Sequence, residues 1–347
     1  MASFSERVSS TISNSLVGLA VSMSWEVGIF QALLDTEVPL TSHQVAQAKG
    51  LKERYVRELL GCMSVAEFVR IVEGEDGTFL YTLEEEAKKA LQSRLAALLT
   101  FPAVLSSTYS SVKECVFQHG PAGHSYSDRV QAFFDNFLEY DAPLLTSAFL
   151  ENVPNLQTKL EQGIDVIEYG AGQGQLSATL ASKFPNSHFV ASEVVSSLVD
   201  KSRTRWDHIS NLSFSLDDAC SLQERPGHEF DWVFCNNVIH DLPDPVAALQ
   251  GIKRVLKKPE GVFTFLDHAF SGSPLKEKGN LDVARYYATG TFLCIPESYQ
   301  REESLALGPC WGKQTSVGML QNAGYLVEVV TLDKARALFI CHHSKET

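Results

Sequence analysis

A glycine-rich turn follows a short apolar segment near the middle of the chain. The sequence runs Asp-Val-Ile-Glu-Tyr-Gly-Ala-Gly-Gln-Gly, so Glu168 stands two positions before three alternating glycines, Gly170, Gly172 and Gly174. Glycines let the backbone turn tightly and approach a ligand, and the helix predicted beyond them presents unpaired N–H groups. Gln175 stands where a dinucleotide-binding loop has its third glycine, and the carboxylate before the turn suits an ammonium group better than a pyrophosphate.

Two further carboxylates follow the next predicted strands. Residues 188–193 predict a strand that ends in Glu193, and an acidic side chain there can accept hydrogen bonds from both hydroxyls of a ribose. Residues 212–216 predict a third strand, after which the carboxylate of Asp218 can meet the amino group of an adenine. Acids that arrive in order at successive strand ends indicate a nucleoside-containing ligand at one edge of a parallel sheet.

Two histidines follow the later strands of the same region. His240 comes shortly after a strand predicted over residues 230–237, and His268 comes directly after one over residues 261–267. Open α/β sheets bind their ligands at the carboxyl ends of the strands, and the pKa of histidine suits a base that works near neutral pH. Either side chain could therefore take the proton of a hydroxyl group, although a hydrogen bond to the backbone is an alternative role for His240.

The elements that must position these residues form one alternating pattern. From about residue 160 onward strands alternate with helices, which predicts a Rossmann-like α/β domain with a parallel sheet and crossover helices. Residues 268–316 interrupt the pattern with aromatic side chains among glycines and prolines, and we interpret them as a lid over an apolar or aromatic molecule. Residues 326–332 and 337–342 predict two closing antiparallel strands.

Three aromatic side chains are candidates for contact with that molecule. Tyr126 lies in an aromatic-rich helical stretch over residues 84–150, whereas Phe292 and Trp311 lie in the predicted lid. Aromatic residues are mostly core residues, but a cluster beside a catalytic domain can also roof a pocket. We expect these three side chains to bind the substrate.

Residues 4–34 predict one helix at the N-terminus. Its apolar side chains recur at spacings of three and four and form a single stripe, which consists of Val8, Ile12, Leu16, Leu19 and Met23. An apolar stripe is stable only when another surface covers it. The stripe is typical of a helix that packs within its own chain. Together with the acidic unit that follows, it also suits a protein partner better than DNA, and we expect a homodimer formed largely through the N-terminal domain.

A compact unit with the element order of a winged helix follows. A short helix begins at a capping box that Thr41 and Gln44 form. Residues 52–66 predict a second helix, and residues 68–72 and 79–83 predict two strands joined by a turn of hairpin type. The order helix, turn, helix, hairpin predicts a mostly helical winged-helix-like domain in front of the α/β domain.

The charge of the chain argues against nucleic acid and membrane partners. The chain has 29 Lys and Arg against 42 Asp and Glu, a net charge of −13, and the excess of acid is present in both halves. The second helix of the winged unit, which would enter a DNA groove, carries three basic residues against two acidic ones: Lys52, Arg54, Arg57, Glu53 and Glu58. Proteins that bind nucleic acids usually present a basic face that neutralises phosphates.

Cysteine usage and targeting features indicate a reducing compartment. The 7 cysteines are scattered and form no C-x-x-C pair, which argues against a disulfide framework and against a zinc site. Acidic residues show no metal-ligand arrangement beyond Asp241 and Asp244, so we predict no metal. The sequence offers neither a secretory start nor a run of about 18 apolar residues that would span a bilayer. We therefore expect a cytoplasmic protein.

Taken together, these stretches resemble the class I S-adenosylmethionine-dependent methyltransferases. The first strand of that family ends in an acid-x-G-x-G-x-G loop, and residues 238–244 with 254–257 are similar to its L-H-D-L-P-D and R-V-L-K-P-G-G stretches. Pro-Glu-Gly at residues 259–261 replaces the Pro-Gly-Gly of the family. Residues 51–60 resemble the winged-helix unit of a subgroup with that layout, to which plant-type small-molecule O-methyltransferases belong. The likeness covers nearly the whole chain.

The resemblance implies a role for each matching residue in binding S-adenosylmethionine. Glu168 would hold the amino group of the methionine part, Glu193 the ribose, and Asp218 with Ala219 the adenine. The glycines would let the backbone pass the cofactor, and Asn236 would line the methionine side. The full set is Glu168, Gly170, Gly172, Gly174, Glu193, Asp218, Ala219 and Asn236.

The sequence thus predicts three segments and one leading activity. Residues 1–100 would be a winged-helix-like dimerisation domain, residues 101–155 a helical connector, and residues 156–347 the methyltransferase domain. We expect methyl transfer to a small apolar or aromatic acceptor, at oxygen. Two alternatives stay open: a protein that binds S-adenosylmethionine but catalyses a different reaction, and a regulator that acts through its winged-helix unit.

Overall fold

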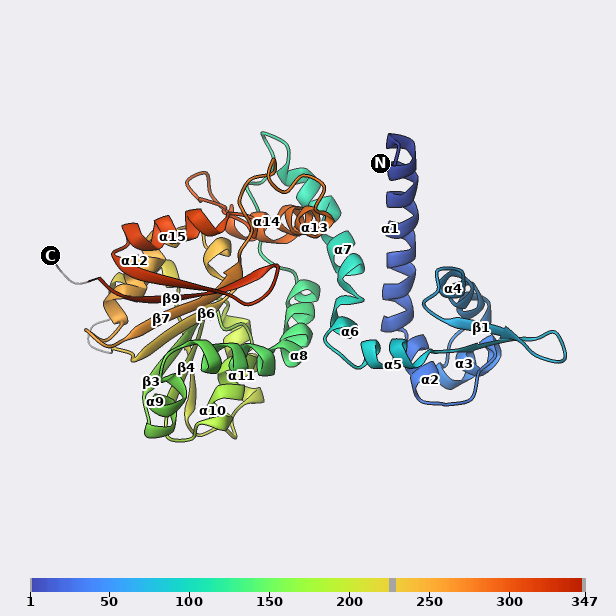
Figure 1. Ribbon diagram of the computed structural model, residues 1–347, viewed down its shortest axis with the longest axis horizontal. Coiled ribbons are helices and arrows are strands. Elements are labelled where there is room, and N and C mark those ends of the chain that lie inside the picture. Colours follow the sequence, from blue (N-terminus) through green and yellow to red (C-terminus); the bar gives the residue numbers. More distant parts are fainter. Residues whose placement is uncertain (1, 225–228, 345–347) are drawn as a thin grey trace. The chain divides into compact units, whose positions relative to one another are not determined.

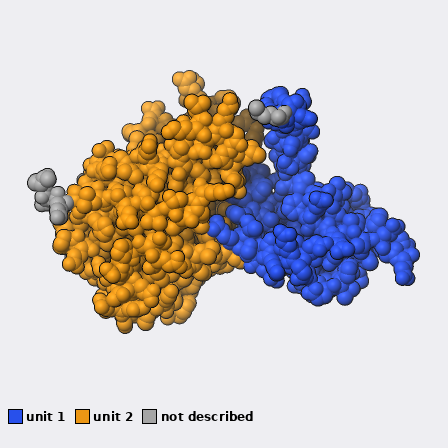
Figure 2. Space-filling view, viewed as in Figure 1, with its two compact units in different colours: residues 1–107 blue, residues 108–347 orange. Residues whose placement is uncertain are grey.

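The chain divides into two compact units, residues 1–107 and 108–347 (Figure 1, Figure 2). The structure is a computed structural model that describes residues 2–224 and 229–344. The division between the units falls inside one helix, α7 (Phe101–Cys115). The sequence instead predicted a separate connector over residues 101–155, and most of that connector is built into the second unit.

The first unit has the element order predicted for a winged helix. Four helices precede a two-stranded antiparallel hairpin, and two short helices follow it: α1 (Phe4–Glu26), α2 (Ile29–Leu34), α3 (Ser42–Lys49), α4 (Glu53–Val65), β1 (Arg70–Glu73), β2 (Phe79–Thr82), α5 (Glu85–Leu91) and α6 (Leu95–Leu98). Its core is a single cluster of buried apolar side chains from these elements, centred on residues such as Ile29, Val56 and Leu60.

The N-terminal helix ends earlier than the sequence predicted. Helix α1 ends at Glu26 and α2 begins at Ile29, because Gly28 adopts a left-handed backbone conformation with a φ of +83°. The predicted apolar stripe lies on α1 and is exposed in the described part of the chain. Its members are between 37% and 63% exposed: Val8, Ile12, Leu16, Leu19 and Met23.

Local interactions stabilise the two helices of the winged unit. At the start of α3 the side chain of Thr41 accepts from the backbone N–H of Gln44, and the Gln44 side chain accepts from that of Thr41. In α4 the arginines pair with acids of their own helix, Arg54 with Glu58 and Arg57 with Glu53 at 3.4 Å. These ion pairs offset the positive charge that a DNA groove would require.

Among the described residues, one helical stretch, Leu95–Cys115, has the length and hydropathy of a membrane-crossing helix. It comprises α6 and α7, and 28% of its most apolar window is buried. The sequence-based expectation that no such run exists was therefore wrong by this measure. Helices that pack on a protein surface meet the same criteria, so the stretch alone does not assign a membrane location.

The second unit alternates strands and helices as predicted. Its elements are α8 (Asp128–Asn152), α9 (Leu156–Gln162), β3 (Asp165–Tyr169), α10 (Gln175–Lys183), β4 (His188–Glu193), α11 (Ser196–Arg205), β5 (Leu212–Leu216), η1 (Ala219–Glu224), β6 (Trp232–Asn236), η2 (Ile239–Asp241), α12 (Pro245–Val255), β7 (Val262–His268), α13 (Leu281–Thr289), η3 (Gly290–Cys294), α14 (Ile295–Ser298), α15 (Lys313–Asn322), β8 (Tyr325–Thr331) and β9 (Arg336–His343).

The strands form one sheet in the order β5-β4-β3-β6-β7-β9-β8. The strands from β5 to β7 are parallel, and β9 runs antiparallel to both β7 and β8, which confirms the predicted closing pair. The register pairs Glu168 with Ala191 and Glu193 with Leu216. The carboxyl ends of β5, β4, β3 and β6 therefore meet at one edge of the sheet, where ligands of open α/β folds bind.

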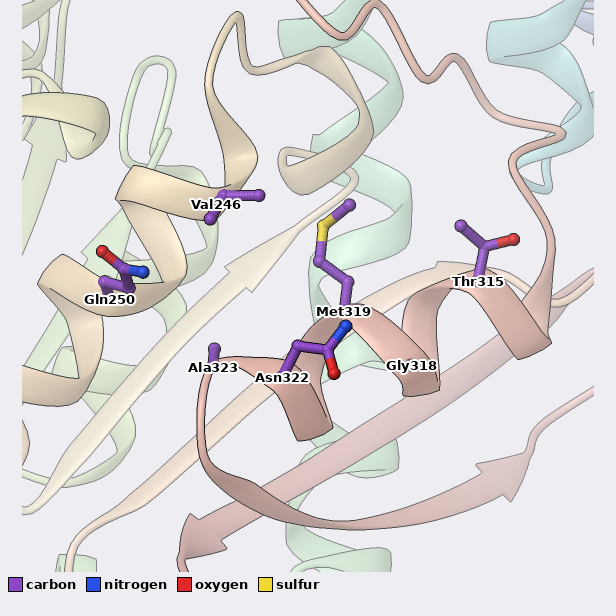
Figure 3. A pocket seen from close by; sticks show the side chains of 7 residues that line it. All are labelled: Val246, Gln250, Thr315, Gly318, Met319, Asn322 and Ala323. Carbon is purple, nitrogen blue, oxygen red and sulfur yellow. The ribbon is translucent and has the colours of Figure 1, made fainter.

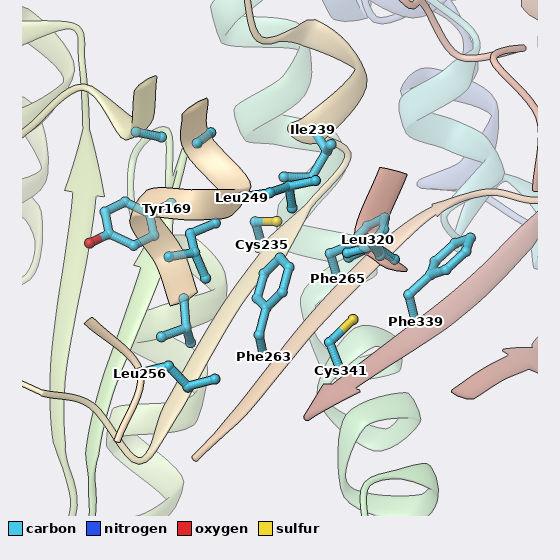
Figure 4. Packing of buried hydrophobic residues seen from close by; sticks show 14 of the residues in the cluster. Tyr169, Cys235, Ile239, Leu249, Leu256, Phe263, Phe265, Leu320, Phe339 and Cys341 are labelled. Carbon is cyan, nitrogen blue, oxygen red and sulfur yellow. The ribbon is translucent and has the colours of Figure 1, made fainter. Parts of the chain in front are cut away.

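The sheet separates two hydrophobic cores because successive side chains point to opposite faces. On β6, Val233 and Cys235 face the cluster that includes side chains of α12 and α15 (Figure 4). Trp232 and Phe234 face the other cluster, which includes side chains of α8, α9 and α10. The ring of Phe149, on α8, lies 5.3 Å from that of Trp232, so the C-terminal half of the predicted connector belongs to this core.

The central part of the predicted lid is helical. Helix α13, the π-helical turn η3 and helix α14 follow one another without a gap between Leu281 and Ser298. A π-helical turn is rare and is frequently found at functional sites, because it re-aims the side chains that follow it. Here it ends at Cys294, which is buried.

Candidate active site

The glycine turn between β3 and α10 leaves room for a ligand at one position. All three glycines have positive φ, +67° at Gly170, +56° at Gly172 and +73° at Gly174. A Cβ on Gly170 would lie 2.5 Å from Val238, and one on Gly174 would lie 2.7 Å from the ring of Phe214. A Cβ on Gly172 would meet nothing within 4 Å. Packing therefore explains the outer glycines, whereas Gly172 faces open space.

A buried carboxyl group stands at the end of β3, before this turn. Glu168 is 4% exposed, and its Oε2 accepts hydrogen bonds from the backbone N–H of Ser177 at 3.1 Å and from the hydroxyl at 2.5 Å. Burial raises the pKa of Glu168 to about 8, although both bonds from Ser177 act in the opposite direction. A cation bound beside Glu168 would lower this pKa and favour the ionised carboxylate.

The acid at the end of β4 organises the same turn. One oxygen of Glu193 accepts from the backbone N–H of Gly172 at 2.9 Å, and the other accepts from those of Val194 and Val195 at 2.9 and 3.1 Å. Burial raises the pKa of Glu193, and these three N–H donors lower it. The structure thus brings Glu168, Gly172 and Glu193 together, as the sequence predicted.

The remaining predicted cofactor residues lie at the ends of the flanking strands. Asp218 follows β5 and accepts from the backbone N–H of Cys220 at 2.8 Å and from the hydroxyl of Ser221 at 3.1 Å. Ala219 is buried at the start of η1, and Asn236 is the half-buried last residue of β6. All eight residues therefore gather at the carboxyl edge of β5, β4, β3 and β6.

His240 lies between two carboxylates beside this edge. It belongs to η2, directly after β6, and is 2% exposed. Its Nδ1 lies 2.8 and 3.0 Å from the carboxylate oxygens of Asp267, at the end of β7, and its Nε2 lies 3.3 Å from Oδ1 of Asp241. Burial alone would lower the pKa of His240, but the charges of Asp267 and Asp241 raise it well above its usual value.

Three other side chains complete the network around His240. The hydroxyl of Tyr126 donates to Oδ2 of Asp241 at 2.9 Å, and the backbone N–H of Tyr126 donates to Glu297 at 2.6 Å. Burial raises the pKa of Glu297 to about 7. Cys294 forms hydrogen bonds with both His240 and Asp241. Oδ1 of Asp241 is buried and has no hydrogen-bond partner among the described residues.

One group of described side chains comes close to a metal-site geometry. His240, Asp241 and Cys294 can each place one ligand atom so that these atoms lie within 4.8 Å of one another. Hydrogen bonds already join the three side chains, and Asp267 holds the other ring nitrogen of His240. We assign no metal to them, and metal-free chemistry stays a prediction.

The second predicted base, His268, has the opposite electrostatic character. Its ring centroid lies 5.7 Å from that of His240 and 4.3 Å from that of Tyr286. Burial lowers the pKa of His268 to about 4, and its Nδ1 is buried without a hydrogen-bond partner among the described residues. Two adjacent histidines whose pKa values are driven apart can take different roles in proton transfer.

Comparison with known proteins identifies the second unit. A family model described as a methyltransferase domain matches residues 160–323. The chain contains a methyltransferase domain. A second family model, described as an Rv2258c-like winged HTH domain, matches residues 15–93 and covers most of the first unit. No curated protein sequence matches the chain significantly.

Solved structures share this arrangement over the whole length of the chain. Human N-acetylserotonin methyltransferase in complex with S-adenosylmethionine is 15% identical, with a TM-score of 0.74 and coverage of 99% of both chains. An O-methyltransferase family protein from Burkholderia thailandensis is 13% identical, with a TM-score of 0.70 and full coverage of both chains. Mitomycin 7-O-methyltransferase is 16% identical, with a TM-score of 0.67 and 97% coverage of both. At these identities the likeness shows the fold alone.

The three predicted substrate-binding aromatics occupy different places in the methyltransferase domain. Tyr126 belongs to the His240 network described above. Phe292 lies on the π-helical turn, where its ring stacks on that of Tyr109 at 6.2 Å. Trp311 is buried in the core shared with α12 and α15, and its Nε1 has no hydrogen-bond partner among the described residues. Contact of these side chains with a substrate stays a prediction.

A separate hollow lies between α12 and α15 of the methyltransferase domain. Its volume is about 430 Å³, and no predicted cofactor residue or histidine lines it (Figure 3). The lining residues are Val246, Gln250, Thr315, Gly318, Met319, Asn322 and Ala323. It is therefore distinct from the site at the carboxyl edge of the sheet.

Sequence reasoning missed three members of the His240 network. Asp267 was counted only as the end of a strand, although an acid at a strand end had marked Glu193 as functional. Glu297 and Cys294 had no signal, because only the π-helical turn brings them toward His240. Asp241 was considered only with Asp244 as a possible metal-ligand arrangement, and its bond with Tyr126 spans 115 positions of the chain and could not be foreseen.

Proposed function

We propose that this chain transfers the methyl group of S-adenosylmethionine to an oxygen atom of a small apolar or aromatic molecule. One observation carries the proposal: Glu168, Gly172 and Glu193 lie at the carboxyl edge of the sheet, where a Cβ on Gly172 would meet nothing within 4 Å, and a carboxylate holds the buried His240 at the end of the next strand. The human neighbour with this fold is a methyltransferase in complex with S-adenosylmethionine. When bound, that cofactor supplies a methyl group activated by its sulfonium charge.

The residues at this edge fit such a cofactor. Both hydrogen bonds from Ser177 go to Oε2 of Glu168, so Oε1 is available to an ammonium group. The open space in front of Gly172 allows a ligand to lie against the backbone. Glu193 and Asp218 present carboxylates at successive strand ends, where ribose hydroxyls and an adenine amino group can donate to them.

The affinity for S-adenosylmethionine should depend on pH through Glu168. Below its pKa of about 8 this carboxyl group is mostly protonated, and it must lose the proton to pair with an ammonium group. We therefore expect the dissociation constant to fall by up to about tenfold per pH unit as the pH rises from 6 to 7.5. Calorimetry in two buffers of different ionisation enthalpy should show release of about one proton per ligand in that range.

The matched control for this linkage is Glu168→Gln, which keeps the shape of the side chain without its titration. The variant should bind more weakly, with no dependence of proton release on pH. Equal proton release by the wild type and by this variant would show that another group titrates, and that Glu168 does not meet the ammonium group.

His240 is the residue we propose as the base for an acceptor hydroxyl. Asp267 fixes the ring through Nδ1, which leaves Nε2 directed at Oδ1 of Asp241, an atom that lacks a hydrogen-bond partner. A hydroxyl that displaces Asp241 from Nε2 can give its proton to this nitrogen as its oxygen takes the methyl group from the sulfonium of the cofactor. Asp267 then stabilises the imidazolium that forms, as carboxylates do for the histidines of hydrolases.

The test of the proposed activity is incubation of the protein with S-adenosylmethionine labelled in its methyl group and a panel of phenols, carboxylic acids and amines. We propose phenols as the labelled class, because they require the base that His240 provides and suit an aromatic-rich lid. Labelling of carboxylic acids alone would show that the acceptor is a group that is already ionised. Such an acceptor needs no base, so this result would contradict the role proposed for His240.

The apolar stripe on α1 supports a second copy of the chain as its partner. The five exposed apolar side chains lie on a helix of 23 residues, and water contact with such a stripe is unfavourable. We expect sedimentation to show a homodimer at tens of micromolar, and Leu16→Glu to shift it toward the monomer. A compact monomer of the wild type at that concentration would contradict this assembly.

The state of the cysteines supports a cytoplasmic location. All seven are free, and Cys235, Cys294, Cys310 and Cys341 are buried. Unpaired thiols persist in a reducing compartment. We propose the cytoplasm on this ground.

A further inference from the structure

Arg205, the last residue of α11, joins two parts of the methyltransferase domain that are far apart in the sequence. Its Nη1 donates to both carboxylate oxygens of Asp135 on α8, at 2.9 Å each. Its Nη2 donates to Glu139, also on α8, at 2.6 Å and to the side-chain oxygen of Gln175 at 3.1 Å. Gln175 is the first residue of α10, directly after Gly174. One guanidinium group thus connects α8 with the end of the glycine turn.

The neighbouring residue holds the same turn by a second bond. The indole Nε1 of Trp206 donates to the backbone oxygen of Gln173 at 2.8 Å, and the guanidinium carbon of Arg205 lies 4.7 Å from the Trp206 ring. Residues 173 and 175 on either side of Gly174 are therefore both held from α11. The turn between them includes Gly174, whose φ of +73° lies in the left-handed region that glycine adopts readily.

The same guanidinium acts on the helix that begins at the His240 network. Helix α8 starts right after Tyr126, whose hydroxyl bonds with Asp241, and the Tyr126 ring lies 5.5 Å from that of Phe134 on α8. The carboxylate of Asp135 is one residue further along. Helix α8 is therefore held just before its start through Tyr126 and about two to three turns later through Arg205.

We propose that Arg205 is a positioning residue for the cofactor. It links the turn around Gly174 to α8 and thereby keeps the backbone of the turn in the conformation that binds the cofactor. The inference rests on the proposed binding of S-adenosylmethionine at this turn. Arg205 itself lies outside that turn and acts through Gln175 and, with Trp206, through Gln173. The planar guanidinium donates from Nη1 to Asp135 and from Nη2 to both Glu139 and Gln175, which fixes distance and orientation in a way that a lysine at this position would not.

The experiment measures binding of S-adenosylhomocysteine to the full chain by calorimetry at 25 °C. We expect Arg205→Gln to raise the dissociation constant about tenfold or more and Arg205→Lys to have an intermediate effect. Trp206→Phe, which removes only the bond to Gln173, should raise the constant about 2- to 10-fold. Lys201→Gln is the matched control, because it removes an exposed positive charge one turn earlier on α11 that also acts on Asp135 but does not tie Gln175 to α8. Its affinity should equal that of the wild type.

A second variant separates positioning from the effect of an unpaired acid. Burial raises the pKa of Asp135 even with Arg205 beside it, so loss of the arginine leaves this carboxylate without its cation. The double variant Arg205→Gln with Asp135→Asn removes both groups. If Arg205 positions the turn, binding should stay weak in the double variant. The backbone amides of residues 172–177 should also exchange their hydrogens faster than in the wild type.

Other outcomes contradict the inference in distinct ways. Recovery of wild-type affinity in the double variant would show that the weaker binding in Arg205→Gln comes from the unpaired carboxylate of Asp135. Unchanged affinity in Arg205→Gln, with a lowered melting temperature alone, would assign a purely structural role to Arg205. Absence of binding by the wild type would overturn the proposed cofactor instead, so the two failures cannot be confused.

Discussion

Replacing Gly172 by valine is expected to abolish binding of S-adenosylmethionine. The wild type should bind in the micromolar range, which corresponds to about −8 kcal/mol. At Gly172 no atom lies within 4 Å of the position that a Cβ would take, so the new side chain enters the space left for the ligand rather than the protein core. Its hydrogen bond to Glu193 also depends on the backbone conformation at φ +56°, which a β-branched residue does not favour. Calorimetry should show no measurable heat of binding.

The control for backbone strain is Gly50→Val in the winged unit. Gly50 has a φ of +66° and, like Gly172, nothing within 4 Å of its potential Cβ. A left-handed conformation costs a residue with a Cβ about 1–2 kcal/mol, so both variants should lose comparable stability. Only the variant at Gly172 should lose the ligand. If Gly172→Val bound S-adenosylmethionine as tightly as the wild type, the assignment of this turn as the cofactor site would be wrong.

Replacing His240 by alanine is expected to lower kcat by a factor of roughly 10²–10⁴ on a hydroxyl acceptor. The side chain is the proposed proton acceptor and touches no residue assigned to the cofactor, so the dissociation constant for S-adenosylmethionine should stay near that of the wild type. His268→Ala should retain most of kcat, because a group with a pKa of about 4 is a weak base. A large loss of kcat in His268→Ala with little loss in His240→Ala would reverse the assignment.

The pH profile identifies the base independently of the size of the rate loss. The carboxylates of Asp267 and Asp241 raise the pKa of His240, and only the neutral ring accepts a proton. In the wild type kcat should therefore rise with pH through a pKa above the usual value for histidine. In Asp267→Asn the pKa of His240 falls because a negative charge is lost, so the rising part of the pH profile of kcat should move to lower pH. A rising part near pH 4 in the wild type would instead point to His268.

Most of the fold could be predicted because its signals are local. Alternating apolar residues place β3 to β7 in the sequence, and the capping box at Thr41 fixes the start of α3. The one error in the first helix also has a local cause, the left-handed Gly28, which an apolar pattern does not reveal. The domain boundaries were harder to place, because Phe149 joins the sheet core through contacts with Trp232 that are distant in sequence.

The gathering of the candidate cofactor residues could be predicted because the strands themselves bring them together. Glu168, Glu193 and Asp218 end three parallel strands, so neighbouring strands in the sheet place them at one edge without any further information. The network around His240 could not be predicted in this way. Its members come from a strand end, a loop before α8 and a π-helical turn, and only tertiary packing brings Asp267, Tyr126 and Cys294 to one histidine.

The central claim is that the site moves a methyl group from S-adenosylmethionine to oxygen. The most direct measurement uses S-adenosylmethionine with a deuterated methyl group and follows both products by mass spectrometry, with Gly172→Val and His240→Ala run beside the wild type. The account predicts equal amounts of S-adenosylhomocysteine and of an oxygen-methylated acceptor carrying the label, at a strongly reduced rate in His240→Ala and none in Gly172→Val. Binding of S-adenosylmethionine by the wild type without any transfer of the label, while the acceptor is converted to another product, would contradict it.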